Sequence, residues 1–236
     1  MRSQISLALV ADGRWPSGGH AHSGGLEAAV RAGLVTDAET LHGWLLGRLM
    51  TTGEVDAAFA SVAWMLAAPA DPAAPPTGSP RTYDGCWTLL IDEYWARVPV
   101  PALRAASMAL GRAALRSAAA TWPLPERLRP TRPNDVDWPW PVAFGAAARA
   151  SGMDRAATAL ALATASVQGP AWSATRLMGL DPYQVARSLA QLVGAIETVT
   201  RRASQCDMDS LPSISEPLLD IGAGNHSNQE VRLFAS

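Results

Sequence analysis

Apolar residues recur at helical spacing along most of the chain. In one run they occupy positions i, i+3, i+4 and i+8, and in another they follow steps of four and three residues. The first run is Leu41, Trp44, Leu45 and Leu49, and the second is Val185, Leu189, Leu192, Ile196 and Val199. The alternation of apolar and polar residues that marks a half-buried strand is almost absent. We therefore expect an all-α protein, a single helical domain over residues 1–236 with a C-terminal tail from about residue 207.

Local signals predict where several helices begin and end. Thr36-Asp37-Ala38-Glu39 has the pattern of a capping box. Asp181-Pro182 places an N-cap residue before a proline at the first helical position. Gly169-Pro170 is predicted to end an apolar helix. The proline-rich segments 68–82 and 122–141 are predicted to be a flexible connection and an ordered crossing loop, respectively.

Lysine is absent, and all 19 basic residues are arginine. A Walker A loop, a pyridoxal-phosphate enzyme and the protein-kinase fold each require a lysine, so these three classes are excluded. The net charge is −2 and the arginines are scattered, so we expect neither nucleic acid nor an anionic membrane as a partner.

Cysteine usage and the length of the apolar runs favour a cytoplasmic protein. Cys86 and Cys206 are far apart in sequence and form no C-x-x-C pair, which favours a reducing compartment. The apolar runs 61–70 and 158–167 are shorter than the roughly 20 residues that span a bilayer. The run 5–11 is too short for a convincing secretory signal.

Residues 15–27 form the most unusual segment of the chain. Its glycine pairs and Pro16 disfavour a regular helix or a central strand, so we expect an irregular loop that leads into a helix. Ser23 is the predicted N-cap of that helix. Glu27 is placed in the first turn, where a carboxylate interacts favourably with the helix dipole; this role is favoured over that of a catalytic acid.

The same segment contains His20 and His22, which have the spacing of a metal-binding pair on an extended loop. Candidates for the remaining ligands are Asp12, Glu27, His42 and His226. We favour a partner-facing loop or buried, hydrogen-bonded imidazoles, because the sequence contains no second compact cluster of ligands. The segment also lacks the Gly-x-Gly-x-x-Gly order of a nucleotide site and the Gly-x-Ser-x-Gly order of a nucleophile elbow.

Arg104, Ser107 and Gly111 fall on one stripe of a predicted helix. The stripe indicates either close helix packing at Gly111 beside a solvated arginine, or a contact with another helix or subunit.

The chain ends in a segment with two large apolar side chains, Arg232-Leu233-Phe234. These side chains either dock on the protein's own core or are captured by a partner. Gly222, Gly224 and Asn225 predict a flexible approach, which favours a segment that becomes ordered on binding.

The opening loop resembles that of the urease accessory protein family UreF. The positions that carry the resemblance are Pro16, Gly18, His22, Ser23, Gly25, Leu26 and Glu27. The helix after Asp181-Pro182, the Arg104-x-x-Ser107-x-x-x-Gly111 run and the closing Arg-Leu-Phe also look like the family, so the resemblance covers most of the chain. His20 and Gly24 depart from the residues common in the family, and they affect the expected loop geometry only.

The resemblance implies a UreF-type helical bundle that forms a homodimer and is not an enzyme. It implies a complex with UreD (also called UreH) and the GTPase UreG that assists nickel insertion into apo-urease, with nickel handled by the complex and no tightly bound cofactor. It also implies partner-binding residues. These are Pro16, Gly18, Ser23, Gly25, Leu26, Glu27, Arg104, Ser107, Gly111, Arg232, Leu233 and Phe234. The alternative is a small metal-binding hydrolase that uses His20 and His22.

Overall fold

The computed structural model describes residues 1–10, 15–16, 18–68, 83–124, 128, 138–227 and 233–234. Within these ranges the protein is all-α, as predicted, and contains no strand. The helices are α1 (Arg2–Val10), α2 (Leu26–Arg31), α3 (Ala38–Arg48), α4 (Glu54–Leu66), α5 (Tyr83–Arg97), α6 (Pro101–Thr121), α7 (Trp140–Ser151), α8 (Arg155–Met178), α9 (Pro182–Gln191), α10 (Val193–Ala203) and α11 (Pro217–Ser227). A 3₁₀ turn, η1 (Gly19–Ala21), precedes α2, and a π-helical segment, η2 (Leu49–Gly53), joins α3 to α4.

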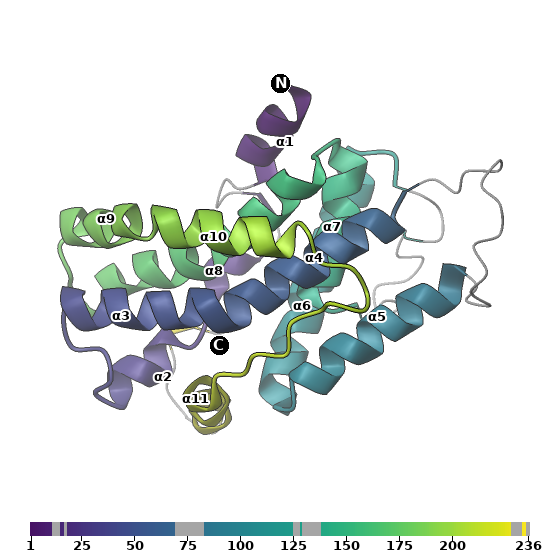
Figure 1. The fold of residues 1–236 in the computed structure, drawn as a ribbon. Coiled ribbons are helices and arrows are strands. Elements are labelled where there is room, and N and C mark those ends of the chain that lie inside the picture. Colours follow the sequence, from purple (N-terminus) through teal and green to yellow (C-terminus); the bar gives the residue numbers. More distant parts are fainter. Residues whose placement is uncertain are drawn as a thin grey trace.

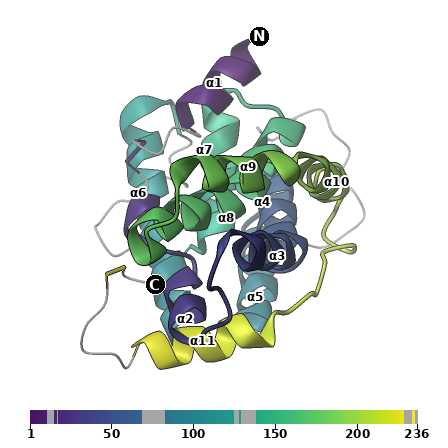
Figure 2. The same ribbon diagram turned by 90° about the vertical axis from the view of Figure 1, so that its left-hand side faces the viewer.

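Helices α3 and α4 together form a long rod through the molecule (Figure 1). Helices α9 and α10 run along this rod, and α8 packs against both pairs. Helix α4 also packs against α7, which in turn packs against α6. Helix α1 projects from the body at the N-terminus, and α11 lies beside α2 at the opposite end (Figure 2).

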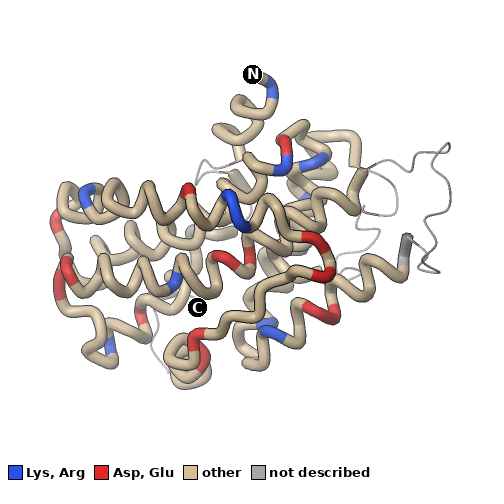
Figure 3. Tube along the Cα trace, viewed as in Figure 1, with Lys and Arg blue, Asp and Glu red and all other residues tan. Residues whose placement is uncertain are grey.

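The predicted apolar faces form the core. Leu41, Leu45 and Leu49 are fully buried, and Val185 and Val199 are buried beneath α9 and α10. Full burial of each such side chain stabilises the fold by roughly 1.5–3 kcal/mol relative to exposure. Charged residues are interspersed along the described trace, and the view in Figure 3 shows no face that collects one sign alone. In the described part of the chain, no helix is both long and apolar enough to cross a membrane.

The prediction that Gly169-Pro170 ends a helix is wrong, because α8 continues through Pro170 to Met178. A proline inside a helix has no N–H to donate, which leaves the carbonyl four residues earlier without its helical partner. That carbonyl belongs to Ser166, and it accepts a hydrogen bond from Arg48 Nε–H at 2.9 Å. A side chain from α3 therefore supplies the donor that Pro170 lacks.

Two helix starts test the predicted capping signals. The capping box lies one residue later than predicted, because Asp37 is the N-cap of α3 and Thr40, not Glu39, is its reciprocal partner. The Thr40 hydroxyl is in reach of the Asp37 backbone N–H, which fixes the register. The prediction for α9 is confirmed, since the Asp181 carboxylate accepts from Tyr183 N–H at 3.0 Å and Pro182 occupies the first turn.

The prediction that a flexible segment precedes the C-terminal tail at Gly222, Gly224 and Asn225 is also wrong. Gly222, Gly224 and Asn225 lie within α11, which packs against α2 and α6. Most of the two proline-rich segments lies outside the described residues. At the end of the second one, the rings of Trp138 and Trp87 are in contact, with centroids 4.7 Å apart.

Candidate functional site

The opening loop places three glycines in the left-handed region of the backbone. The φ angles of Gly18, Gly24 and Gly25 are 82°, 62° and 92°. Gly25 is the N-cap of α2, and a Cβ atom built there would lie only 2.6 Å from a methyl group of Leu219 in α11. The positive φ therefore favours glycine at this position, and any larger residue would also require the Leu219 side chain to shift.

Ser23 was predicted to be the N-cap of α2, but it lies two residues before the actual N-cap. Its hydroxyl is nevertheless close to the Glu27 backbone N–H, with a donor–acceptor distance of 3.3 Å, and its carbonyl accepts from Leu26 N–H. Ser23 is fully buried and so satisfies helix-start donors that water cannot reach.

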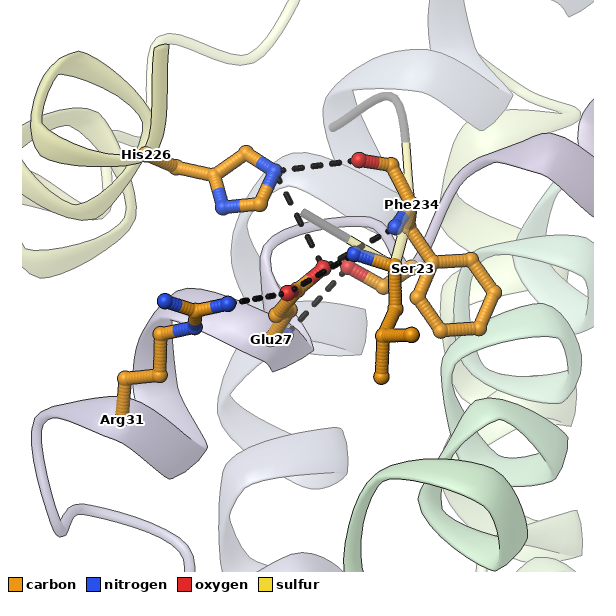
Figure 4. Close-up of polar contacts among 6 residues, drawn as sticks. Ser23, Glu27, Arg31, His226 and Phe234 are labelled. Atoms are coloured by element: carbon orange, nitrogen blue, oxygen red, sulfur yellow. Dashed lines mark hydrogen bonds and ion pairs between the residues drawn. The ribbon is translucent and has the colours of Figure 1, made fainter. Parts of the chain in front are cut away.

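Glu27 lies in the first turn of α2, as predicted, and is in addition a buried receptor for the C-terminal tail (Figure 4). Only 1% of its surface is exposed. One carboxylate oxygen accepts from Leu233 N–H at 3.1 Å, and the other accepts from Phe234 N–H at 3.0 Å. Arg31, one turn along α2, donates to the first oxygen at 2.9 Å. A single carboxylate thus joins the start of α2 to the end of the chain.

The surroundings of Glu27 determine its ionisation. Burial alone would raise its pKa, but hydrogen bonds from Leu233, Phe234 and Arg31, together with the charge of His226, lower the pKa below its ordinary value. A carboxyl whose pKa is lower in the folded than in the unfolded chain stabilises the fold above the unfolded pKa. That contribution is lost as the pH falls through the lowered folded pKa, so acid weakens this contact.

His226 of α11 completes the arrangement, and only 4% of its surface is exposed. Its Nε2 lies 3.3 Å from the carbonyl oxygen of Phe234 and 4.0 Å from the Glu27 carboxylate. A carbonyl only accepts, so this geometry assigns the proton to Nε2. Sequence reasoning considered His226 only as a possible metal ligand, because nothing local indicates its contact with the tail. Glu27, His226, Leu233 and Phe234 are called the tail site below.

The tail site separates the two apolar side chains of the C-terminus. Phe234 is buried, with 7% of its surface exposed, and the guanidinium of Arg176 lies over its ring. Leu233 points outward and is 69% exposed. Arg232 lies outside the described residues. Phe234 therefore docks on the protein's own fold, while Leu233 remains available.

Arg104, Ser107 and Gly111, which share one stripe of α6, lie where this helix meets α5 and α7. The Ser107 hydroxyl accepts from Trp140 N–H at 2.8 Å, and Gly111 faces the Trp138 carbonyl so closely that a Cβ would overlap it. Arg104 donates to the carbonyls of Val98 and Trp95. These intramolecular contacts account for the stripe within one chain, and its role in binding a partner stays a prediction.

The remaining residues of the opening loop are spread over several elements. The carbonyl of Pro16 accepts from the hydroxyl of Ser117 in α6 at 2.7 Å, and Leu26 is fully buried. His22 lines a cavity beside the opening loop, whereas the side chain of His20 lies outside the described residues. No group of three or more possible metal ligands occurs in the part of the chain that the structure describes. Metal binding by the two histidines stays a prediction.

Comparisons with known proteins identify the family of the chain. The family model named UreF matches residues 35–193. A protein of Mycobacterium sp. (strain JLS) named urease accessory protein UreF is 37% identical over 238 residues, covering all of both chains. Proteins of the same name from Mycolicibacterium vanbaalenii and Mycobacterium tuberculosis (strain H37Ra) are 37% and 34% identical, again over the full length of both chains. The chain therefore belongs to the UreF family of urease accessory proteins.

Proposed function

We propose that this protein is a non-catalytic accessory factor in the maturation of urease. It forms a complex with UreD (UreH) and the GTPase UreG, acts in the cytoplasm as a homodimer, and assists the insertion of nickel into apo-urease. Nickel is the cargo of the complex, and the protein itself holds no tightly bound cofactor. The full-length similarity to proteins named urease accessory protein UreF supports this role. The absence of lysine is consistent with GTP chemistry residing in another chain.

The observation that best supports a binding function is an apolar groove between α2 and α11. Leu218 and Ile221 on the outer side of α11 are 63% and 60% exposed. They line a groove between α2 and α11, together with Leu34 and Trp44. They provide apolar surface that a partner would remove from water, and Leu233 of the tail is exposed as well.

Co-expression with UreD, UreG and the urease subunits tests the proposed function. We expect the protein to co-purify with both partners and urease activity to depend on its presence. A variant with Leu218→Asp and Ile221→Asp should fold normally but fail to co-purify with UreD, because two charges would be buried in the contact. Full urease activation in cells that lack this protein would contradict the proposal.

The two apolar residues of the tail are predicted to have separable roles. Phe234→Ala should lower the free energy of unfolding by about 2–3 kcal/mol, because it removes a buried ring. Leu233→Ala should leave the thermal melt unchanged and weaken UreD binding, because Leu233 is exposed. Thermal melts and UreD pull-downs on both variants check this prediction. Unchanged UreD binding by Leu233→Ala would remove Leu233 from the proposed interface.

A further inference from the structure

A cavity of about 230 Å³ lies between the opening loop, η2 and helices α4, α5, α6 and α8. Most of its wall is apolar, with Val55, Leu103 and Leu162 among the lining residues. Two oppositely charged groups from neighbouring elements, Arg48 and Asp56, also line it. The cavity is distinct from the tail site, and an inference about it does not rest on the proposed function.

Asp56 has one strong polar partner in this cavity. The Tyr94 hydroxyl donates a hydrogen bond to the carboxyl group at 2.9 Å. Burial raises the pKa of Asp56 to about 6, and the Tyr94 hydrogen bond and the charge of Arg48 only partly oppose this effect. Asp56 therefore changes its charge near neutral pH, unlike an exposed aspartate.

No ion pair joins Arg48 to Asp56 in the described part of the chain. The Arg48 Nε–H donates to the Ser166 carbonyl that Pro170 leaves free. Its guanidinium lies against the opening loop, because the Nη2 atom would be 3.1 Å from a Cβ built at Gly24. Burial lowers the pKa of Arg48, and the charges of Asp56 and Glu216 oppose that shift. The guanidinium is thus held on the loop while electrostatically coupled to Asp56.

We propose that Asp56 and Arg48 form a proton-controlled switch. When Asp56 loses its proton, the Arg48 guanidinium moves toward the carboxylate and releases its contact with the opening loop at Gly24. Opposite charges on partly buried groups attract more strongly than the same charges in water, and the long arginine side chain is able to reorient. Protonation of Asp56 removes that attraction and returns the Arg48 guanidinium to the loop.

The other charged and titratable groups around the cavity modulate this switch. His22 comes from the opening loop, Tyr94 and Arg97 from α5, and Glu216 and Asp220 from the segment that leads into and begins α11. The lining residues from α6, α7 and α8 carry no charge. Arg97 is held by the Glu93 carboxylate and by three backbone carbonyls, and Glu216 accepts from Thr51. These contacts leave Arg48 as the cation that responds to Asp56.

Amide hydrogen exchange on the isolated protein tests the switch. Protection factors are measured for peptides that cover residues 18–26 from about pH 5 to about pH 7.5, with the intrinsic pH dependence of exchange removed. We expect protection of this segment to fall severalfold as the pH rises, with a midpoint near the pKa of Asp56, about 6. Asp56→Asn should abolish the change. Asp92→Asn, which alters an exposed carboxyl on α5, should preserve it.

A second variant keeps the test decisive if Asp56→Asn does not fold. Tyr94→Phe removes the hydrogen bond that favours the ionised carboxyl, so the midpoint of the loop transition should move to higher pH. An unchanged midpoint in Tyr94→Phe would overturn the proposal. A transition that persists in Asp56→Asn would also overturn it and would assign the pH response to another group, such as His22.

Discussion

Gly111→Ala is expected to lower the free energy of unfolding by about 2–3 kcal/mol, although it adds only one methyl group. A Cβ atom at this position overlaps the backbone carbonyl of Trp138, which cannot rotate away as a side chain can. The helix α6 would have to move away from the segment that leads into α7, and the Ser107–Trp140 hydrogen bond would lengthen. Chemical denaturation of the purified variant measures the effect.

Gly43→Ala provides the matched control for Gly111→Ala. Gly43 lies within α3, is exposed, and has no atom within 4 Å of a built Cβ. The substitution should therefore stabilise the protein by up to about 1 kcal/mol, because alanine favours a helix over glycine. Parent-like stability of Gly111→Ala would contradict this prediction. If that variant also failed to bind a partner, Gly111 would be a partner contact instead of a site of close internal packing.

Glu27→Ala is expected to lower the free energy of unfolding by about 2–4 kcal/mol. The substitution leaves the N–H groups of Leu233 and Phe234 without an acceptor, and Phe234 is buried. Each buried donor left unpaired costs about 1–3 kcal/mol. The first-turn dipole interaction that the sequence suggested for Glu27 would by itself contribute less than about 1 kcal/mol.

Glu39→Ala is the corresponding control, because Glu39 is an exposed acid in the first turn of α3. Its effect on stability should stay below about 1 kcal/mol. Glu27→Gln should fall between the two, because one amide oxygen remains to accept while the charge near Arg31 and His226 is lost. Equal melting temperatures for Glu27→Ala and Glu39→Ala would show that the tail is not held by Glu27.

The features that the sequence predicted correctly depend on residues close together in the chain. Leu41, Leu45 and Leu49 lie on one helical face because of their spacing alone, and that face is buried. Asp181-Pro182 begins α9 because the cap and the fixed φ of proline act within one turn. The N-cap of α3 is Asp37, one residue after the predicted Thr36. Both residue types are acceptable caps, and the contacts of Thr40 decide between them.

The predictions from the sequence were wrong where residues distant in the chain stabilise a helix. A proline normally ends a helix, but at Pro170 the missing donor to the Ser166 carbonyl is supplied by Arg48, which lies 118 residues before Ser166. Glycines in α11 predicted a flexible segment, but Leu219 and Ala223 are buried on the inner side of this helix. Packing energy outweighs the roughly 1 kcal/mol that each helical glycine costs.

The sequence by itself therefore determined the all-α class, the main helical faces and the family, because periodicity and motif spacing are properties of neighbouring residues. Only the tertiary structure decided the role of Glu27, which lies 207 residues from Phe234, and the burial of His226 between them. It also decided that Arg48 and Asp56 share one cavity. A carboxylate in a first turn looks the same in sequence whether it faces water or a buried backbone. The physical difference arises from desolvation and hydrogen bonding, which exist only after distant segments have packed together.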